Sequence, residues 1–492
     1  MNYSNKIYNA TKWSAITNIL SKITPPITNM ILARLLTPEA FGVVATINMV
    51  ITFADIFADA GFQKYLVQHN FDDEESLYKS ANVAFWTNFS ISIFLWLIIF
   101  LLKDNISAMV GSEGYGIHLS VAAFSIPLIA FSSIQQAIYK RNFDFKGMFL
   151  PKLIRSFVPL VVTVPIAYFY RNCWALIIGT LAANFSDALL LTIRSKWKPK
   201  FFYKLKLLKE MFSFSAWTLL ETLAIWLTTS IDVFIIGRVL SQYYLGLYKT
   251  SLTTVEQITT LITTTIVPVL FATLSRFQDD DEQFKKMFYS FQQKCAILLV
   301  PLSIGIFVFK DLVTAILLGR QWVEAATFIS LLGIIQFVRI LICYFASEVY
   351  RSKGQPKVSF LIQVIYIVIL IPVVYFSSRK GFECLYQVRI LTYILFAGMH
   401  LLVLKFRFNF KIFSMVKTIM FPLFASLIMG AVGYILLLCK DSILFQFLFV
   451  FICILVYFLL CLCFKDTRNT LKSFIPKHKS LLNETQSMDK MD

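Results

Sequence analysis

Several ionised side chains lie inside long apolar stretches of this chain. An ionised residue near the centre of a bilayer costs roughly 2.5–3.5 kcal/mol on insertion scales, so such residues pair with one another or line water. Arginine suits phosphate because its guanidinium donates two parallel hydrogen bonds. We therefore predict a site for a phosphorylated ligand. Its candidate cations are Arg34, Lys64, Arg155, Arg238 and Arg339.

Carboxylates recur in two of the same stretches. Asp55 and Asp59 are about one helical turn apart and share a helix face. Glu221 and Asp232 are separated by close to three whole turns and also share a face. We expect these acids to pair with the cations in the empty state, or to carry a coupling proton or sodium ion. For any single charge, a structural ion pair or an anchor at a helix end is the alternative. Further charges in the predicted spans include Lys22, Asp187, Lys249, Glu256, Lys294, Glu348 and Arg389.

The composition requires a membrane for the elements that position these charges. The chain has 492 residues, of which 58% are hydrophobic and only 15% are charged. A soluble domain cannot hide that much apolar surface, so the sequence predicts an all-α polytopic membrane protein with about 14 spans. The predicted spans are 13–36, 41–67, 80–102, 115–138, 150–170, 173–193, 211–237, 245–274, 288–309, 325–349, 358–376, 382–404, 414–438 and 443–464.

Two pairs of motifs indicate an internal duplication. Arg34-Leu-Leu-Thr-Pro-Glu-Ala-Phe-Gly42 recurs as Arg238-Val-Leu-Ser-Gln-Tyr-Tyr-Leu-Gly246, and Ile138–Lys146 recurs as Val349–Lys357. Duplicated membrane chains are typical of transporters that handle substrate between their halves. The predicted parts are an N-lobe of six spans (1–195), a basic linker (196–210), a C-lobe of six spans (211–405), two further spans (406–464) and a disordered tail (465–492).

The net charge of +18 is placed as a membrane protein places it. Most of the Lys and Arg fall in loops on one side, which by the positive-inside rule puts both termini in the cytoplasm. The linker alternates lysines with Phe201, Phe202 and Leu205, so we expect an amphipathic helix that contacts anionic membrane lipids. This placement argues against nucleic acid as a partner.

Pro25 and Pro26 interrupt the first predicted span. Each proline removes a backbone donor and clashes with the preceding turn, so the helix bends. We expect this kink to act as a gate, and a static kink is the alternative. The eight cysteines form no CxxC pattern and the four histidines are scattered, so we expect no metal and no cofactor.

The stretch Met30–Ala45, followed by Phe53-Ala-Asp-Ile-Phe-Ala-Asp-Ala-Gly-Phe62 and Leu66-Val-Gln68, resembles the polysaccharide transporter family. This is the lipopolysaccharide and O-antigen flippase branch of the multidrug/oligosaccharidyl-lipid/polysaccharide exporter superfamily. Ile138–Lys146 and Asp232-Val-Phe-Ile-Ile-Gly-Arg238 resemble it too.

The resemblance implies two six-helix bundles that move an undecaprenyl-pyrophosphate-linked oligosaccharide from the cytoplasmic to the periplasmic leaflet of a bacterial inner membrane. It implies no enzyme activity, with a polysaccharide polymerase and chain-length machinery as further partners. A lipid II flippase and a multidrug exporter of the same superfamily are the alternatives. A membrane glycosyltransferase or polymerase is a third, although the short loops between the predicted spans lead us to expect no extramembrane domain for one.

Overall fold

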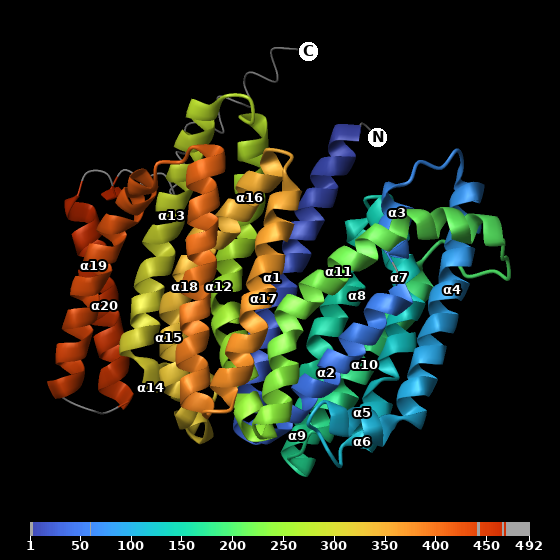
Figure 1. The fold of residues 1–492 in the computed structure, drawn as a ribbon, viewed down its shortest axis with the longest axis horizontal. Helices are drawn as coiled ribbons and strands as arrows, with labels where there is room; N and C mark the ends of the chain where they lie inside the picture. The colour runs from blue at the N-terminus through green and yellow to red at the C-terminus, as the bar shows by residue number, and fades with distance from the viewer. Residues whose placement is uncertain (1–2, 60, 440–442, 465–466, 469–492) are drawn as a thin grey trace. The chain divides into compact units, whose positions relative to one another are not determined.

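Every regular element that the computed structural model describes is a helix (Figure 1). The structure describes residues 3–59, 61–439, 443–464 and 467–468. Within these ranges it leaves undescribed the side chains of 3–12, 14–16, 18–19, 213–218, 221, 261 and 443. The predicted tail, apart from residues 467–468, therefore lies outside the described residues.

The helices of the first part of the chain end at Arg194. They are α1 (Tyr3–Leu35), α2 (Pro38–Asp59), α3 (Phe62–Gln68), α4 (Glu74–Leu101), α5 (Lys103–Met109), α6 (Gly116–Ala122), α7 (Ser125–Arg141), α8 (Phe145–Val158), the π-helix η1 (Pro159–Thr163), α9 (Val164–Tyr170) and α10 (Trp174–Arg194).

The remaining helices begin at Leu205. They are α11 (Leu205–Val239), α12 (Gln242–Arg276), α13 (Asp281–Val308), α14 (Lys310–Leu317), the 3-10 helix η2 (Arg320–Ala325), α15 (Ala326–Val338), the π-helix η3 (Arg339–Tyr344), α16 (Phe345–Ser352), α17 (Pro356–Ser378), α18 (Phe382–Phe408), α19 (Ile412–Cys439) and α20 (Ile443–Cys463).

The chain forms two compact units. One comprises Met1–Leu261, Val313–Leu332 and Lys357–Leu395, and the other comprises Ile262–Leu312, Gly333–Pro356 and Phe396–Asp492. In the first unit, α4, α7, α8 and α10 pack as neighbouring rods (Figure 1). In the second, α19 packs between α13 and α20. The division into lobes at 1–195 and 211–405 stays a prediction.

The prediction of an all-α polytopic membrane protein is confirmed. Each of the predicted spans contains a helix, and among the described residues 12 helices are long and apolar enough to cross a membrane. The number is 13 if the two stretches of α12 count as one bent span. Helix α1 is long enough but more polar, because Ser21, Thr28 and Asn29 face a cavity between α1, α8 and α10. A helix that lines water does not need an apolar surface on every side.

The second pair of motifs folds into the same turn twice. After α7, Phe143 has a φ of 56°, and the Asp144 amide donates to the Tyr139 carbonyl at 3.0 Å. After α16, Gly354 has a φ of 68°, and the Gln355 amide donates to the Tyr350 carbonyl at 2.7 Å. In both turns a left-handed residue is followed by an amide that donates to the carbonyl five residues earlier. This arrangement is the Schellman motif, which ends a helix. The repeat in the sequence is therefore a repeat in backbone geometry.

The basic linker differs from the prediction. Residues 195–204 are not helical, and only 205–210 belong to a helix, as the first turns of α11. Pro199 explains this, because a proline disfavours helical geometry in the residue before it. The segment is instead tied to α4: the Trp86 ring nitrogen donates to the Lys200 carbonyl at 2.9 Å, and Phe201 stacks on Trp86.

Candidate functional site

The first pair of motifs forms a crossing between α2 and α12. A Cβ atom at Gly42 would collide with the carbonyl oxygen of Gln242, and one at Gly246 would collide with that of Pro38. These four residues occupy equivalent positions in the two copies of the motif, so the contact is reciprocal. Only glycine permits this close approach of two backbones. The duplicated motif therefore joins the two repeats where each begins a helix.

Arg34 caps a helix beside this crossing. Its guanidinium donates to the Met30 carbonyl of its own helix at 3.2 Å, and to the Ala315 and Ile316 carbonyls at the end of α14. Trp322 donates in return from its ring nitrogen to the Ala33 carbonyl of α1, at 2.8 Å. Basic side chains stabilise helix C-termini because the last carbonyls there have no partner in the helix. Arg34 thus has a local structural task, and it lines neither of the two cavities near the crossing.

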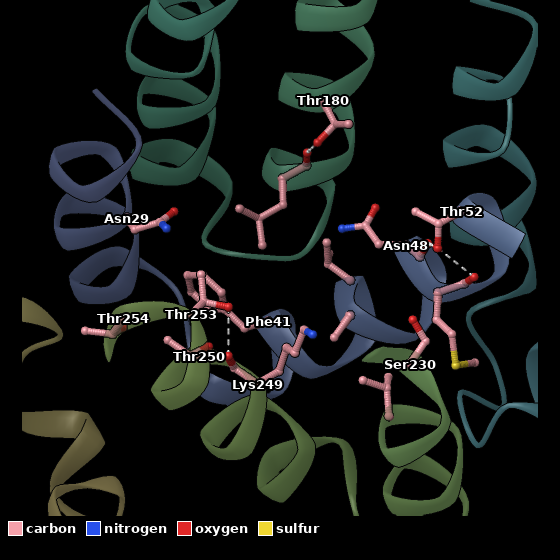
Figure 2. Close-up of a pocket in the computed structure, with 15 residues that line it drawn as sticks. Asn29, Phe41, Asn48, Thr52, Thr180, Ser230, Lys249, Thr250, Thr253 and Thr254 are labelled. Atoms are coloured by element: carbon pink, nitrogen blue, oxygen red, sulfur yellow. Dashed lines mark hydrogen bonds between the residues drawn. The ribbon is translucent and has the colours of Figure 1, made fainter. Parts of the chain in front are cut away.

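A cavity of about 400 Å³ lies beside the crossing, between α1, α2, α10, α11 and α12. Its residues include Phe41 and Val44, on either side of Gly42, and Lys249 and Thr250, one turn after Gly246. Figure 2 shows the Asn29, Asn48 and Lys249 side chains reaching into the space between the helices. We call it the glycine-side cavity. Its polar lining residues are Asn29, Asn48, Thr52, Thr180, Ser230, Lys249, Thr250, Thr253 and Thr254.

A second cavity of about 500 Å³ lies between α1, α8, η1 and α10, and we call it the arginine-side cavity. Asn29, Leu176 and Thr180 line both cavities, so the two adjoin. Lys152 and Arg155 supply its positive charge. Pro159 explains the π-helix in its wall, because it cannot donate to a carbonyl one turn earlier and the chain widens there.

Arg155 is held in place but remains accessible. Its two terminal nitrogens donate to Asp187 and Asn184, each at 3.0 Å. The side chain of Arg155 is 45% exposed, whereas that of Asp187 is 3% exposed. A guanidinium has five N–H donors, so donors remain for a ligand. Within the described part of the chain, no carboxylate lines either cavity, whereas three cations do.

Asp232 lies in a buried network close to the glycine-side cavity. Its carboxylate accepts from the Tyr248 hydroxyl at 2.8 Å and from the Arg389 guanidinium at 3.4 Å. Arg389 also donates to the Tyr366 hydroxyl at 2.6 Å and lies over the ring of Tyr393. This network fixes α11, α12, α17 and α18 to one another. The cation that pairs with Asp232 is thus none of the five that the sequence selects.

The other predicted residues lie away from the two cavities. Arg238 is exposed at the end of α11, next to the contact of Gly237 with Gly111. Lys64 is on α3. Arg339 opens η3 and donates to Gln336 at 3.0 Å. Their role in substrate binding stays a prediction.

The predicted acids and prolines also occupy defined places. Asp55 and Asp59 are on the last two turns of α2, and neither lines a cavity. The side chain of Glu221 lies outside the described residues. Helix α1 continues through Pro25 and Pro26, and Pro25 lines the arginine-side cavity. The coupling roles of the acids and the gating role of the prolines stay predictions.

The sequence interpretation did not select Lys152, Lys249 or Arg389. Lys152 lies three residues before Arg155, a helical spacing that could have marked a shared face. Lys249 and Arg389 belong to the charges inside predicted spans, but their spacing to other charges shows no pattern. Only packing reveals that Arg389 is fully engaged and that Lys249 faces a cavity.

Comparison with known proteins agrees with the fold and the motifs. A family model described as "Polysaccharide biosynthesis protein" matches residues 31–327. The lipopolysaccharide biosynthesis protein WzxC of Escherichia coli (strain K12) is 20% identical over 383 residues, which cover 77% of each chain.

Two solved structures share the fold. The lipid II flippase MurJ in an inward closed conformation gives a TM-score of 0.74 at 16% identity, over 92% of this chain and 98% of that one. An inward-facing multidrug resistance MATE family transporter gives 0.61 at 14% identity, over 79% and 94%. The predicted resemblance is confirmed at the level of the family. This chain belongs to the polysaccharide biosynthesis protein family, and it is a multi-pass membrane transporter rather than an enzyme.

Proposed function

We propose that this protein moves an undecaprenyl-pyrophosphate-linked oligosaccharide from the cytoplasmic to the periplasmic leaflet of a bacterial inner membrane. The observation that carries the proposal is the lining of the two adjoining cavities. It combines cations, hydroxyl groups and amides and, among the described residues, lacks carboxylates. Such a lining suits a phosphorylated and hydroxylated ligand.

The cavities would replace the water that the head group loses. Bare transfer of charged and hydroxylated groups through hydrocarbon is prohibitive, because each polar group loses its hydrogen bonds. Lys152 and Arg155 bind the pyrophosphate, and the threonine and asparagine side chains bind the sugar. The prenyl tail stays in lipid. Alternating opening of the cavity to the two faces completes the transfer.

The charge of the lining separates this proposal from a multidrug exporter. A transporter of cationic drugs needs a net acidic cavity, whereas the cavities here carry Lys152, Arg155 and Lys249. A lipid II flippase is a closer alternative, because lipid II shares the pyrophosphate and differs in its sugar. Deletion of the gene distinguishes these two substrates, because the cell loses its surface polymer in one case and its cell wall in the other.

The test is genetic. Deletion of the gene should abolish surface polymer and leave lipid-linked single repeat units in the cytoplasmic leaflet. Wild type should restore the polymer, and Lys152→Gln should not. Lys405→Gln is the matched control, because it removes the same charge from an exposed side chain on α18, outside both cavities. If the units reach the periplasmic leaflet without the protein, it is not their flippase. If cell-wall synthesis stops instead, the substrate is lipid II.

The proposed orientation has a separate test. Cysteines placed at Glu113 and Lys204 should react with an impermeant thiol reagent from opposite sides, the periplasmic and the cytoplasmic respectively. Labelling of both from one side would contradict the orientation without affecting the proposed substrate.

A further inference from the structure

The two cavities differ in the polar and charged groups that line them. The arginine-side cavity contains two cations, Lys152 and Arg155. The glycine-side cavity contains hydroxyl and amide groups with one cation, Lys249. Hydroxyl and amide groups are what a neutral sugar requires, so an ammonium group among them calls for its own explanation.

The ammonium group of Lys249 faces the glycine-side cavity. Among the described residues, the structure records no hydrogen bond or ion pair from its Nζ, although its backbone carbonyl accepts from the Thr253 hydroxyl at 2.9 Å. Figure 2 shows the side chain extending from α12 toward the region between α1 and α2. A cation inside a membrane protein is costly, and it is retained where it serves a ligand or a partner.

The backbone that carries Lys249 is fixed on both sides. Gly246, one turn before it, is locked against α2 at the glycine crossing. Tyr248, its neighbour, is fully buried, and its hydroxyl group bonds to Asp232 and Arg389. The side chain of Lys249 therefore starts from a backbone position that is fixed on both sides, and this limits the region that its ammonium group can reach.

The pyrophosphate has a better site elsewhere. Lys152 and the pre-oriented Arg155 together match its charge of about two, as bidentate recognition of phosphate predicts. The cavities meet at Asn29, Leu176 and Thr180, so a glycan that starts at the pyrophosphate extends past these residues toward Lys249. The group that meets Lys249 then belongs to a sugar.

We propose that Lys249 recognises a carboxylate on the glycan, so that the preferred substrate carries a uronic acid among the sugars near the pyrophosphate. This inference rests on the proposed function and adds the chemical class of the glycan. A neutral sugar in the same place leaves the ammonium group desolvated without a counter-charge. Sites built for a polar group reject analogues that lack it, because their own buried groups are then left unpaired.

The test compares probes that differ in one group. The purified full-length protein in nanodiscs is titrated with a short-chain polyprenyl pyrophosphate disaccharide of two glucose units. Two further probes replace the first or the second glucose by glucuronic acid. We expect wild type to prefer one acidic probe by about tenfold to a hundredfold, the range of a charge-assisted hydrogen bond. Lys249→Gln should remove the preference, and Lys249→Arg should keep it.

The control is Lys152→Gln in the arginine-side cavity, which should weaken the acidic and neutral probes by the same factor. Equal binding of all probes by wild type would overturn the inference and leave the proposed function standing. An equal loss for all probes in Lys249→Gln would also overturn it, because Lys249 would then serve the pyrophosphate. If wild type binds none of the probes, the inference and the proposed function both fail.

Discussion

Arg155 combines a fixed ion-pair partner with donors that remain for a ligand. Its ion pair with Asp187 at 3.0 Å orients the guanidinium, while nearly half of the side chain stays exposed in the cavity. Arg34, by contrast, donates from its guanidinium to helix carbonyls and lines neither cavity. Residue type alone does not distinguish the two, because an arginine near the end of a span can cap, snorkel or bind a ligand.

Removal of Arg155 should reveal both roles. Arg155→Gln leaves the buried Asp187 carboxylate without its counter-charge, so we expect a loss of about 1–3 kcal/mol in stability together with a loss of transport. Arg155→Gln with Asp187→Asn should recover the stability but not the transport. Thermal unfolding in detergent and complementation of the deletion strain measure the two effects. Recovery of transport by the double variant would assign Arg155 a structural role only.

At the level of the helices, two backbone features involve both copies of a repeated motif. They are the glycine crossing and the helix-ending turn. Each was visible in the sequence as similar residues at similar spacing, but its geometry was not. Phe143 shows why: its counterpart Gly354 is a glycine, and the left-handed backbone that both adopt is unusual for phenylalanine. The fold imposes this conformation on Phe143, and the residue type does not predict it.

Exchange of the two turn residues should have opposite effects. A left-handed conformation costs a non-glycine residue about 1–2 kcal/mol, so Phe143→Gly should stabilise the protein by up to about 1 kcal/mol after the entropy of glycine is subtracted. Gly354→Ala should destabilise it by about the same amount. Thermal unfolding of the two variants checks the signs. Destabilisation by Phe143→Gly would mean that contacts of its ring outweigh the backbone strain.

The glycine crossing predicts two matched losses. Gly42→Ala and Gly246→Ala should each destabilise the protein by about 1–3 kcal/mol or more, because the new methyl group meets a backbone carbonyl. Gly305→Ala in α13 is the control: a Cβ atom added there would meet no described neighbour within 4 Å, and alanine favours a helix. Thermal unfolding compares the three. Equal stability of all three variants would contradict the crossing.

At the level of the whole molecule, the net transfer of charge sets the driving force. The proposed movement carries a negative pyrophosphate outward from an inside-negative cell. A pyrophosphate with about two charges gains roughly 4–5 kcal/mol at 100 mV if it crosses the full field. The membrane potential alone could thus drive the transfer, without countertransport.

Proteoliposomes can test this drive. A potassium gradient with valinomycin imposes a potential, and the flux of a lipid-linked oligosaccharide is followed by its accessibility at the outer surface. We expect outward flux to rise when the inside is negative and to fall when the sign is reversed. A flux that does not depend on the potential but follows a proton or sodium gradient would support the predicted coupling role of Asp55 and Asp59.

The class of the protein, the positions of the long helices and the family all follow from the amino-acid sequence without a structure, whereas short helices such as α5 and α14 do not. The class, the long helices and the family do so because apolar length and charge placement are local properties, and because the motifs around Arg34 and Ile138 are contiguous. The repeated motifs can also be recognised in the sequence. The surroundings of Arg34 are not evident there: only the structure shows that this side chain donates to the carbonyls at the end of α14, and its role in substrate binding stays a prediction.

Which charges face a cavity depends on how the helices pack. Lys152 and Arg155 are about one helical turn apart, but no sequence pattern connects them to Lys249. The three side chains line adjoining cavities because α8, α10 and α12 are brought around α1 and α2. Asp232 pairs with Arg389, which is far away in the chain, and no spacing rule connects helices that meet only on folding. The fate of a buried charge is set by its neighbours in space, and the helices supply these neighbours only when they come together.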